Sequence, residues 1–197
     1  GEGVAAILGW EGDPDRVAAR RAASAAIAAR HGGRAVPGDG GDRWAESRYA
    51  APYLRDVLMD RGVLVETLET AAPWSRLGEL HRAVGAALDA ALRERGTPPL
   101  VLCHVSHVHP TGASLYFTVL AAQERGAEAD QWRAAKAAAL DAILAHGATI
   151  THHHAVGRDH APWLAGEIGA LGVASLQALK ARLDPAGVMN PGVLGLR

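Results

Sequence analysis

The chain has 197 residues, which is enough to bury a hydrophobic core in one domain or in a closely packed pair of domains. Hydrophobic residues make up 49% and charged residues 21% of the sequence, and this composition excludes an intrinsically disordered chain. Lys and Arg number 20 against 21 Asp and Glu, so the formal net charge of -1 offers no long-range attraction to polyanions. Nucleic acid is therefore not expected as a partner.

The single cysteine, Cys103, excludes an internal disulfide and fits a reducing compartment. We interpret it as a small, buried apolar residue. The first residues contain no initiator Met and no signal-peptide pattern, and residues 4–8 already have the composition of a strand. We therefore expect the chain to be a fragment of a larger protein, with a cytoplasmic location; association with a membrane stays open.

The first 60 residues predict one strand and two helical segments. The strand covers residues 3–10, and the helix after it runs to about Arg30, with Asp13 as its cap and Pro14 at its first position. Two glycines after His31 end this helix. A second helical stretch is predicted for residues 42–60.

The rest of the chain alternates predicted strands and helices. The strands are predicted at residues 63–70, 100–108, 113–120 and 148–151, and the helices at 75–94, 131–146 and, as one or two helices, 161–183. A turn at residues 110–112 joins two of the strands. Since Gly-rich phosphate loops are missing, the pattern favours an α+β fold, a mostly antiparallel sheet with helices packed on one face.

Three consecutive histidines, His152, His153 and His154, form the most informative motif. They follow a predicted strand, and on an extended backbone His152 and His154 would share one face while His153 points to the other. An imidazole can accept or donate a proton near neutral pH, and it can hydrogen-bond an anion. A single histidine is more often a hydrogen-bonded structural side chain, but a run of three favours a functional pocket.

A second group of histidines, His104, His107 and His109, lies on the preceding strand and turn. His107 and His109 would alternate onto one strand face, as two ligands of one metal do. Zinc needs three or four ligands, so such a site would have to recruit His152 or His154. Spacing alone does not bring the two groups together, and we assign no metal ligands.

Two further side chains have both a structural and a functional interpretation. Tyr116 lies on the strand after the turn, where an aromatic residue commonly belongs to the core. Arg55 would ordinarily be a surface arginine paired with an acid, but in a cleft its guanidinium is well suited to hold a phosphate or carboxylate. Periodicity does not choose between these interpretations.

Several motifs, taken together, resemble one family: the flavin-linked oxidases of the vanillyl-alcohol oxidase type, and within them alkyldihydroxyacetonephosphate synthase and its bacterial relatives. The matching segments are residues 48–56, 66–74, 112–117 and 151–157, followed by Asp184-Pro185 and Asn190-Pro191-Gly192. They occur in the family's order over nearly the whole chain. Arg158-Asp159-His160, and Ala155 where the eukaryotic synthases have glycine, resemble the bacterial branch.

The resemblance implies that residues 1–197 form the substrate-binding cap and C-terminal tail of an FAD-dependent enzyme, whose N-terminal FAD-binding domain lies outside this chain. The implied reaction exchanges an acyl for an alkyl group on dihydroxyacetone phosphate, a step of ether lipid synthesis. By similarity, Tyr116, His152, His153 and His154 would be catalytic.

The same resemblance implies the remaining contacts. Arg55, Tyr53 and His107 would bind a small phosphate or carboxylate substrate, which in the synthase reaction is lipid-like. His153, His154, Gly157 and Asn190 would face the FAD.

Two alternatives remain. Relatives on this scaffold include FAD-dependent 2-hydroxy acid dehydrogenases or oxidases with a histidine-bound metal, which here would lie near His107 and His152. In those relatives an acid beside a later histidine is a metal ligand, and in this sequence a histidine occupies that position. The second alternative is a non-catalytic module that binds a lipid or a partner protein.

Overall fold

The computed structural model describes residues 4–196, without the side chains of Ala51 and Pro52. The chain divides into two compact units, Gly1–Arg55 and Asp56–Arg197, and the boundary falls inside a helix. Each unit is described by itself.

The N-terminal unit has less regular structure than its sequence predicts. Residues 4–10 form no strand, and the predicted strand over residues 3–10 is therefore wrong where the structure describes it; Gly3 lies outside the described residues. A strand needs a hydrogen-bonded neighbour, and the pairings in the described part of the chain join only the three later strands. Val4 and Ile7 are accordingly exposed.

Helix α1 (Pro14–Arg30) confirms the prediction from local signals. Its cap residue Asp13 accepts hydrogen bonds through Oδ1 from the backbone N–H groups of Asp15 and Arg16, both at 3.1 Å. The predicted helical stretch 42–60 is instead two helices, α2 (Gly40–Ser47) and α3 (Ala51–Asp60). Pro52 explains the break, because it has no backbone N–H with which a helix continuing from α2 could be hydrogen-bonded.

The C-terminal unit contains a three-stranded antiparallel sheet in the order β1-β3-β2. Its strands are β1 (Val63–Pro73), β2 (Leu100–Ser106) and β3 (Gly112–Ala122). The connection between β2 and β3 requires a glycine where β3 begins, since a β-carbon on Gly112 would lie 2.3 Å from the carbonyl oxygen of Ala72. Strand β2 ends two residues earlier than predicted, because His107 has a φ of 46° and leaves the extended conformation.

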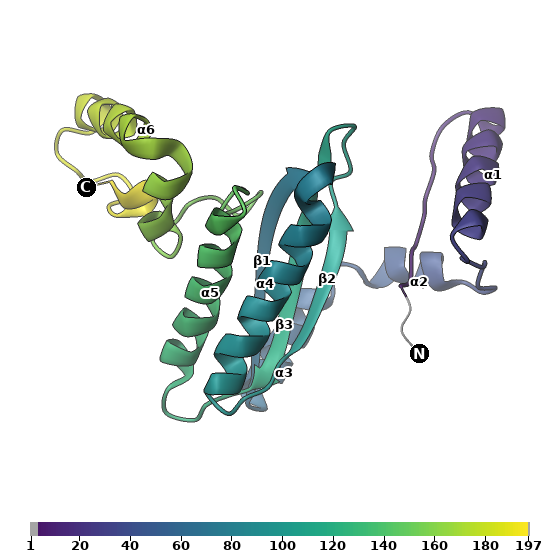
Figure 1. Ribbon diagram of the computed structural model, residues 1–197, viewed down its shortest axis with the longest axis horizontal. Coiled ribbons are helices and arrows are strands. Elements are labelled where there is room, and N and C mark those ends of the chain that lie inside the picture. Colours follow the sequence, from purple (N-terminus) through teal and green to yellow (C-terminus); the bar gives the residue numbers. More distant parts are fainter. Residues whose placement is uncertain (1–3, 197) are drawn as a thin grey trace. The chain divides into compact units, whose positions relative to one another are not determined.

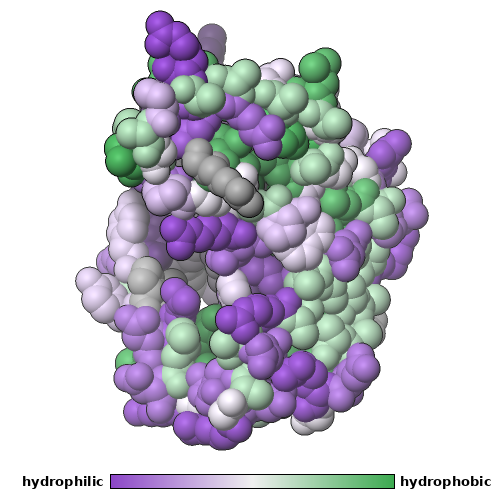
Figure 2. Space-filling view, turned by 90° about the vertical axis from the view of Figure 1, so that its left-hand side faces the viewer, coloured by the Kyte–Doolittle hydropathy of each residue, from purple (hydrophilic) through white to green (hydrophobic). Residues whose placement is uncertain are grey.

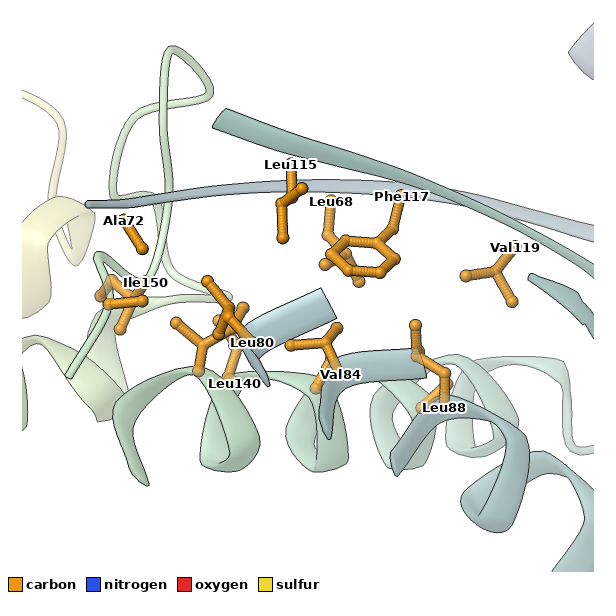
Figure 3. Packing of buried hydrophobic residues seen from close by; sticks show 14 of the residues in the cluster. Leu68, Ala72, Leu80, Val84, Leu88, Leu115, Phe117, Val119, Leu140 and Ile150 are labelled. Atoms are coloured by element: carbon orange, nitrogen blue, oxygen red, sulfur yellow. The ribbon is translucent and has the colours of Figure 1, made fainter. Parts of the chain in front are cut away.

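Helices α4 (Trp74–Glu94) and α5 (Glu128–Ala145) cover one face of this sheet, as Figure 1 shows. Leu80, Val84 and Leu88 of α4 pack beneath Leu115 and Phe117 of β3, and all five are buried (Figure 3). Each such side chain contributes roughly 1.5–3 kcal/mol by leaving water. The predicted α+β class with helices packed on a mostly antiparallel sheet is confirmed.

The chain ends in α6 (Ala161–Leu183) and a 3-10 turn, η1 (Val193–Gly195). Helix α6 consists of two helical segments joined at Gly169, where φ is 73° and ψ is 169°. Hydrophilic and hydrophobic side chains are intermixed on the side of the molecule that carries α5 and α6 (Figure 2). In the part of the chain that the structure describes, none of the helices is long and apolar enough to cross a membrane.

Candidate functional site

The face of the sheet that lies away from α4 and α5, here called the outer face, carries polar side chains. Strand residues alternate between faces, so the burial of Leu68 and Phe117 against the helices places Glu69 and Tyr116 on the outer face. Glu69 is the register partner of Tyr116, and Tyr116 is also that of His104. The sheet thus sets three side chains capable of proton transfer in one row across its strands.

Glu69 lies at the β1 end of this row and is only 5% exposed. Its Oε1 accepts a hydrogen bond of 2.7 Å from the Ser114 hydroxyl. Three imidazoles surround the same carboxylate: His152 Nδ1 is 3.4 Å and His107 Nε2 is 3.8 Å from Oε1, and His154 Nε2 is 3.7 Å from Oε2. A buried carboxylate requires such partners, because an unpaired charge in a low-dielectric environment is costly.

The histidine run follows a segment that lies along the edge of β1. Thr149 N and His152 N donate to the carbonyl oxygens of Ala71 and Glu69, at 3.4 and 3.1 Å. Despite these contacts residues 148–151 form no strand, so the short strand predicted there is wrong. The Thr149 carbonyl accepts from the Thr70 hydroxyl at 2.6 Å, and the two backbone bonds alone do not make a regular ladder.

The histidine run itself is a bend and not an extended segment. His153 and Ala155 have φ values of 62° and 60°, a conformation that residues with a β-carbon rarely adopt. The prediction that an extended backbone places His152 and His154 on one face is therefore wrong, because the backbone here is not extended. His152 and His154 nevertheless reach the same carboxylate, because the bend turns both toward Glu69.

Helix α6 and the C-terminal tail hydrogen-bond the segments before and after this bend. Both carboxylate oxygens of Glu167 are used, one by the Thr149 hydroxyl at 2.6 Å and the other by the Ile150 backbone N–H at 2.8 Å. On the far side of the bend, Leu194 N donates to Val156 O at 3.1 Å. Arg158 Nη2 donates to Pro191 O at 2.8 Å. The histidine backbone is thus anchored on both sides.

The aromatic rings of the site contact one another. Tyr116 meets His154 edge to face, with ring centroids 5.7 Å apart and an interplanar angle of 87°. His107 lies against His153 at a centroid distance of 4.4 Å and against His152 at 5.0 Å. These contacts bring together the five residues that were predicted from two distant segments of sequence.

The same rings form a candidate metal site. His107, His152 and His153 each offer a nitrogen, and the three ligand atoms lie within 4.8 Å of one another. The predicted pairing of His107 with His109 on one strand face is wrong, because both follow the end of β2. The backbone of His109 instead secures the turn: its N–H donates to Gly112 O at 2.8 Å, and its carbonyl accepts from Trp74 Nε1 at 2.9 Å.

The remaining predicted contact residues lie in three places. Tyr53 and Arg55 are exposed on α3 at the end of the N-terminal unit. Gly157 follows the histidine bend, and a β-carbon there would meet open space. Asn190 is exposed in the tail, with a φ of 47°, and lines an apolar groove of about 280 Å³ between α6 and η1. Their binding roles stay predictions.

A second charged group lies on the helix-covered side of β1. Glu66 accepts a hydrogen bond from Trp132 Nε1 and pairs with Lys136, whose Nζ is 3.5 Å from Oε1. His160 is buried nearby, and its pKa lies below the ordinary value because of burial and, next, the positive charge of Lys136. His160 is thus favoured in its neutral form.

Glu69 is the functional candidate that reasoning from sequence alone did not assign. It lies within residues 66–74, one of the segments that resemble the family, and an acid in a strand is ordinarily a solvated side chain. The available signal was its spacing from Leu68, which places it on the opposite face of the strand. Its three histidine partners come from other segments and could not be inferred locally.

The domain is an antiparallel sheet with helices on one face and a cluster of titratable side chains on the other. The chain belongs to the family of FAD linked oxidases, C-terminal domain, which matches residues 1–194. The family expected from the motifs is thereby confirmed.

Alkyldihydroxyacetonephosphate synthases are among the similar proteins. The one from Dictyostelium discoideum is 29% identical over 185 residues, covering 94% of this chain and 30% of the relative. The one from Caenorhabditis elegans is 37% identical over 144 residues, covering 71% of this chain and 24% of the relative. A solved structure of an alkyldihydroxyacetonephosphate synthase matches with a TM-score of 0.53 and 26% identity, covering 79% of this chain and 24% of that one. The chain thus spans less than a third of the length of these relatives.

Proposed function

We propose that this chain is the substrate-binding part of an FAD-dependent enzyme that replaces the acyl group of an acyl-dihydroxyacetone phosphate with an alkyl group. The similarity to alkyldihydroxyacetonephosphate synthases over 94% of the chain supports the reaction class. The observation that carries the proposal is the cluster of His152, His154 and Tyr116 around buried Glu69.

The residues present fit a flavin on the outer face. His153 and His154 are exposed there, and Gly157 offers space for close approach. Thr151 Oγ1 and His152 Nδ1 are buried polar atoms that lack a hydrogen-bond partner among the described residues. In this proposal His153, His154, Gly157 and Asn190 hold the FAD, together with an N-terminal FAD-binding domain. When bound, FAD supplies the electron sink for the reaction.

The side chains of this chain supply proton transfer and orientation. The carbon beside the substrate ketone must lose a proton before the acyl group leaves as a carboxylate, and Tyr116 with the histidine run accepts that proton. Arg55 holds the substrate phosphate with its fork of N–H donors, while Tyr53 and His107 contact the rest of the polar headgroup. A fatty alcohol then takes the place of the acyl group, and no net oxidation results.

Product analysis tests this proposal. The full-length protein is incubated with an acyl-dihydroxyacetone phosphate and a fatty alcohol, and the products are identified by mass spectrometry. We expect an alkyl ether product and one free fatty acid for each ether formed, without consumption of an electron acceptor. Fatty acid release that leaves no ether, or product formation that requires an electron acceptor, would contradict the exchange reaction.

Arg55→Ala is expected to raise KM for the phosphate substrate at least about tenfold, since a charge-assisted hydrogen bond contributes roughly 1.5–3 kcal/mol. Arg61→Ala, at an exposed arginine just after α3, is the matched control and should leave KM unchanged. An unchanged KM in Arg55→Ala would remove the phosphate role and leave the reaction class standing.

The metal geometry favours a second candidate, an FAD-dependent 2-hydroxy acid dehydrogenase or oxidase. Three nitrogens within 4.8 Å could hold a divalent cation, which would polarise the hydroxy acid as a Lewis acid. Elemental analysis of the purified full-length protein separates the candidates. Stoichiometric zinc or manganese, together with reduction of an electron acceptor by a 2-hydroxy acid, would support the dehydrogenase and count against the synthase.

A further inference from the structure

The unassigned carboxylate of Glu69 is the strongest feature that the proposed roles leave unused. It is buried, while the residues around it that were proposed to transfer protons are at least partly exposed. One oxygen accepts a hydrogen bond from Ser114 of β3, and nitrogens of His107, from the β2–β3 connection, and of His152, from the histidine bend, lie 3.8 and 3.4 Å from it. A side chain in this position acts on the site through the groups that it contacts.

The geometry constrains where each imidazole carries its proton. A neutral imidazole has one N–H and one nitrogen with a free lone pair. The lone pair of a bare nitrogen facing a carboxylate oxygen at 3.4 to 3.7 Å is repelled, whereas an N–H in the same place is attracted. The carboxylate therefore favours a proton on Nδ1 of His152 and on Nε2 of His154.

The buried Nδ1 of His152 supports this assignment. It has no hydrogen-bond partner among the described residues, and the Glu69 carboxylate oxygen Oε1 lies 3.4 Å away. The Ser114 hydroxyl already donates to the same oxygen, which keeps the carboxylate turned toward the histidine bend.

We propose that Glu69 is the positioning residue of this site, and that its carboxylate fixes the tautomers of His152 and His154 so that Nε2 of His152 and Nδ1 of His154 are free to accept a proton. The catalytic consequence rests on the proposed function, and the tautomer assignment does not. Tyr116 lies edge to face against His154, and the proposed function uses both side chains for proton transfer.

Nuclear magnetic resonance of the full-length protein, labelled with nitrogen-15 in the histidine rings, tests the assignment directly. Signals are assigned with His152→Gln and His154→Gln, and pyrrole-type and pyridine-type nitrogens are distinguished by chemical shift. We expect a protonated Nδ1 in His152 and a protonated Nε2 in His154. The opposite tautomer in either ring of the unaltered protein overturns the proposal, whether or not any variant folds.

Glu69→Gln tests the cause, because the amide keeps the size of the side chain but can both donate and accept. We expect mixed tautomers at both histidines. Glu66→Gln is the matched control, since that carboxylate lies three residues away on the opposite face of the same strand and contacts Trp132 and Lys136. Tautomers that stay fixed in Glu69→Gln would overturn the role of Glu69.

Steady-state kinetics provides the functional readout. Glu69→Gln should lower kcat about 10- to 100-fold, the usual effect of losing a partner that orients a functional histidine, with less change in KM. Glu66→Gln should retain kcat. A Glu69→Gln protein with altered tautomers and full kcat would overturn the positioning role. Correct tautomers in a protein without exchange activity would instead remove the proposed function and leave the assignment intact.

Discussion

At the scale of single residues, burial on the two faces of one strand gives neighbouring side chains different chemical roles. Glu66 and Glu69 belong to the same strand. Glu66 pairs with Lys136 on the helix-covered face, whereas Glu69 lies close to the imidazoles of His152 and His154 on the outer face. Alternation along the strand separates them. The partners of a carboxylate in this strand therefore depend on the face of the sheet that it occupies.

Cys103 provides a prediction at this scale. It is half-buried on the helix-covered face of β2, and burial raises the pKa of its thiol to about 11. Because the thiolate is the nucleophile, a disulfide reagent should modify the folded protein slowly at pH 7.5 and much faster after unfolding in urea. Fast, stoichiometric modification without denaturant would show that Cys103 is a reactive thiol and not a core residue.

His160 provides a second prediction. Its pKa in the folded chain is lowered, by burial first and by Lys136 next, so the unfolded chain takes up a proton that the folded chain resists. The resulting stability is fully present above the unfolded value near 6.5 and is lost as the pH falls through the lower folded pKa. We expect His160→Gln to flatten this decline.

Urea unfolding between pH 7.5 and pH 5 measures that decline. His104→Gln is the control, because His104 is exposed on β2. Equal slopes against pH for His160→Gln and the unaltered chain would contradict the role of His160.

At the scale of elements, the histidine bend depends on a helix that is separate from it in sequence. Glu167 of α6 holds Thr149 and the backbone N–H of Ile150, just before the bend. Its removal leaves a backbone N–H in a largely buried segment without an acceptor, which costs about 1–3 kcal/mol.

Glu167→Ala should therefore lower the free energy of unfolding by roughly this amount. It should also increase hydrogen exchange at Ile150 and through the histidine bend. Glu94→Ala, at an exposed position at the end of α4, should change neither quantity. Unaltered exchange at Ile150 in Glu167→Ala would show that the bend is held by other contacts.

The elements that the sequence predicts well are those determined by local chemistry. Asp13 and Pro14 define the start of α1, and the apolar stripe of α4 places Leu80, Val84 and Leu88 against the sheet. Residues 4–10 and 148–151 also have strand composition, but a strand requires a partner, and pairing is not visible locally.

The candidate site was predictable in its residue types and not in its arrangement. The His152 to His154 run and Tyr116 could be singled out from motifs, because three successive imidazoles are rarely needed for packing. The positive φ of His153 and the convergence on Glu69 depend on hydrogen bonds from β1 and α6. The contacts with β1 join residues about 80 positions apart and that with α6 joins residues 17 apart, so neither has a signature in a short window of sequence.

At the scale of the whole molecule, the chain spans only 24% to 30% of the synthases from Caenorhabditis elegans and Dictyostelium discoideum. A site made of one wall binds a large cofactor poorly, because most of the cofactor surface must be enclosed for tight binding. We expect residues 1–197 purified alone to show no visible flavin absorbance, and the full-length protein to be yellow. Stoichiometric FAD on residues 1–197 would contradict the two-part organisation.

The acid/base role of the outer face is tested most directly by single-turnover kinetics of the full-length protein carrying Tyr116→Phe or His154→Gln. Both variants should lower the rate about 10²- to 10⁴-fold, the usual contribution of a positioned proton-transfer group, while the flavin stays bound. His146→Gln, at the end of α5, is the control and should react at the original rate. Full turnover in both Tyr116→Phe and His154→Gln would contradict a catalytic role for the cluster and favour a non-catalytic binding module.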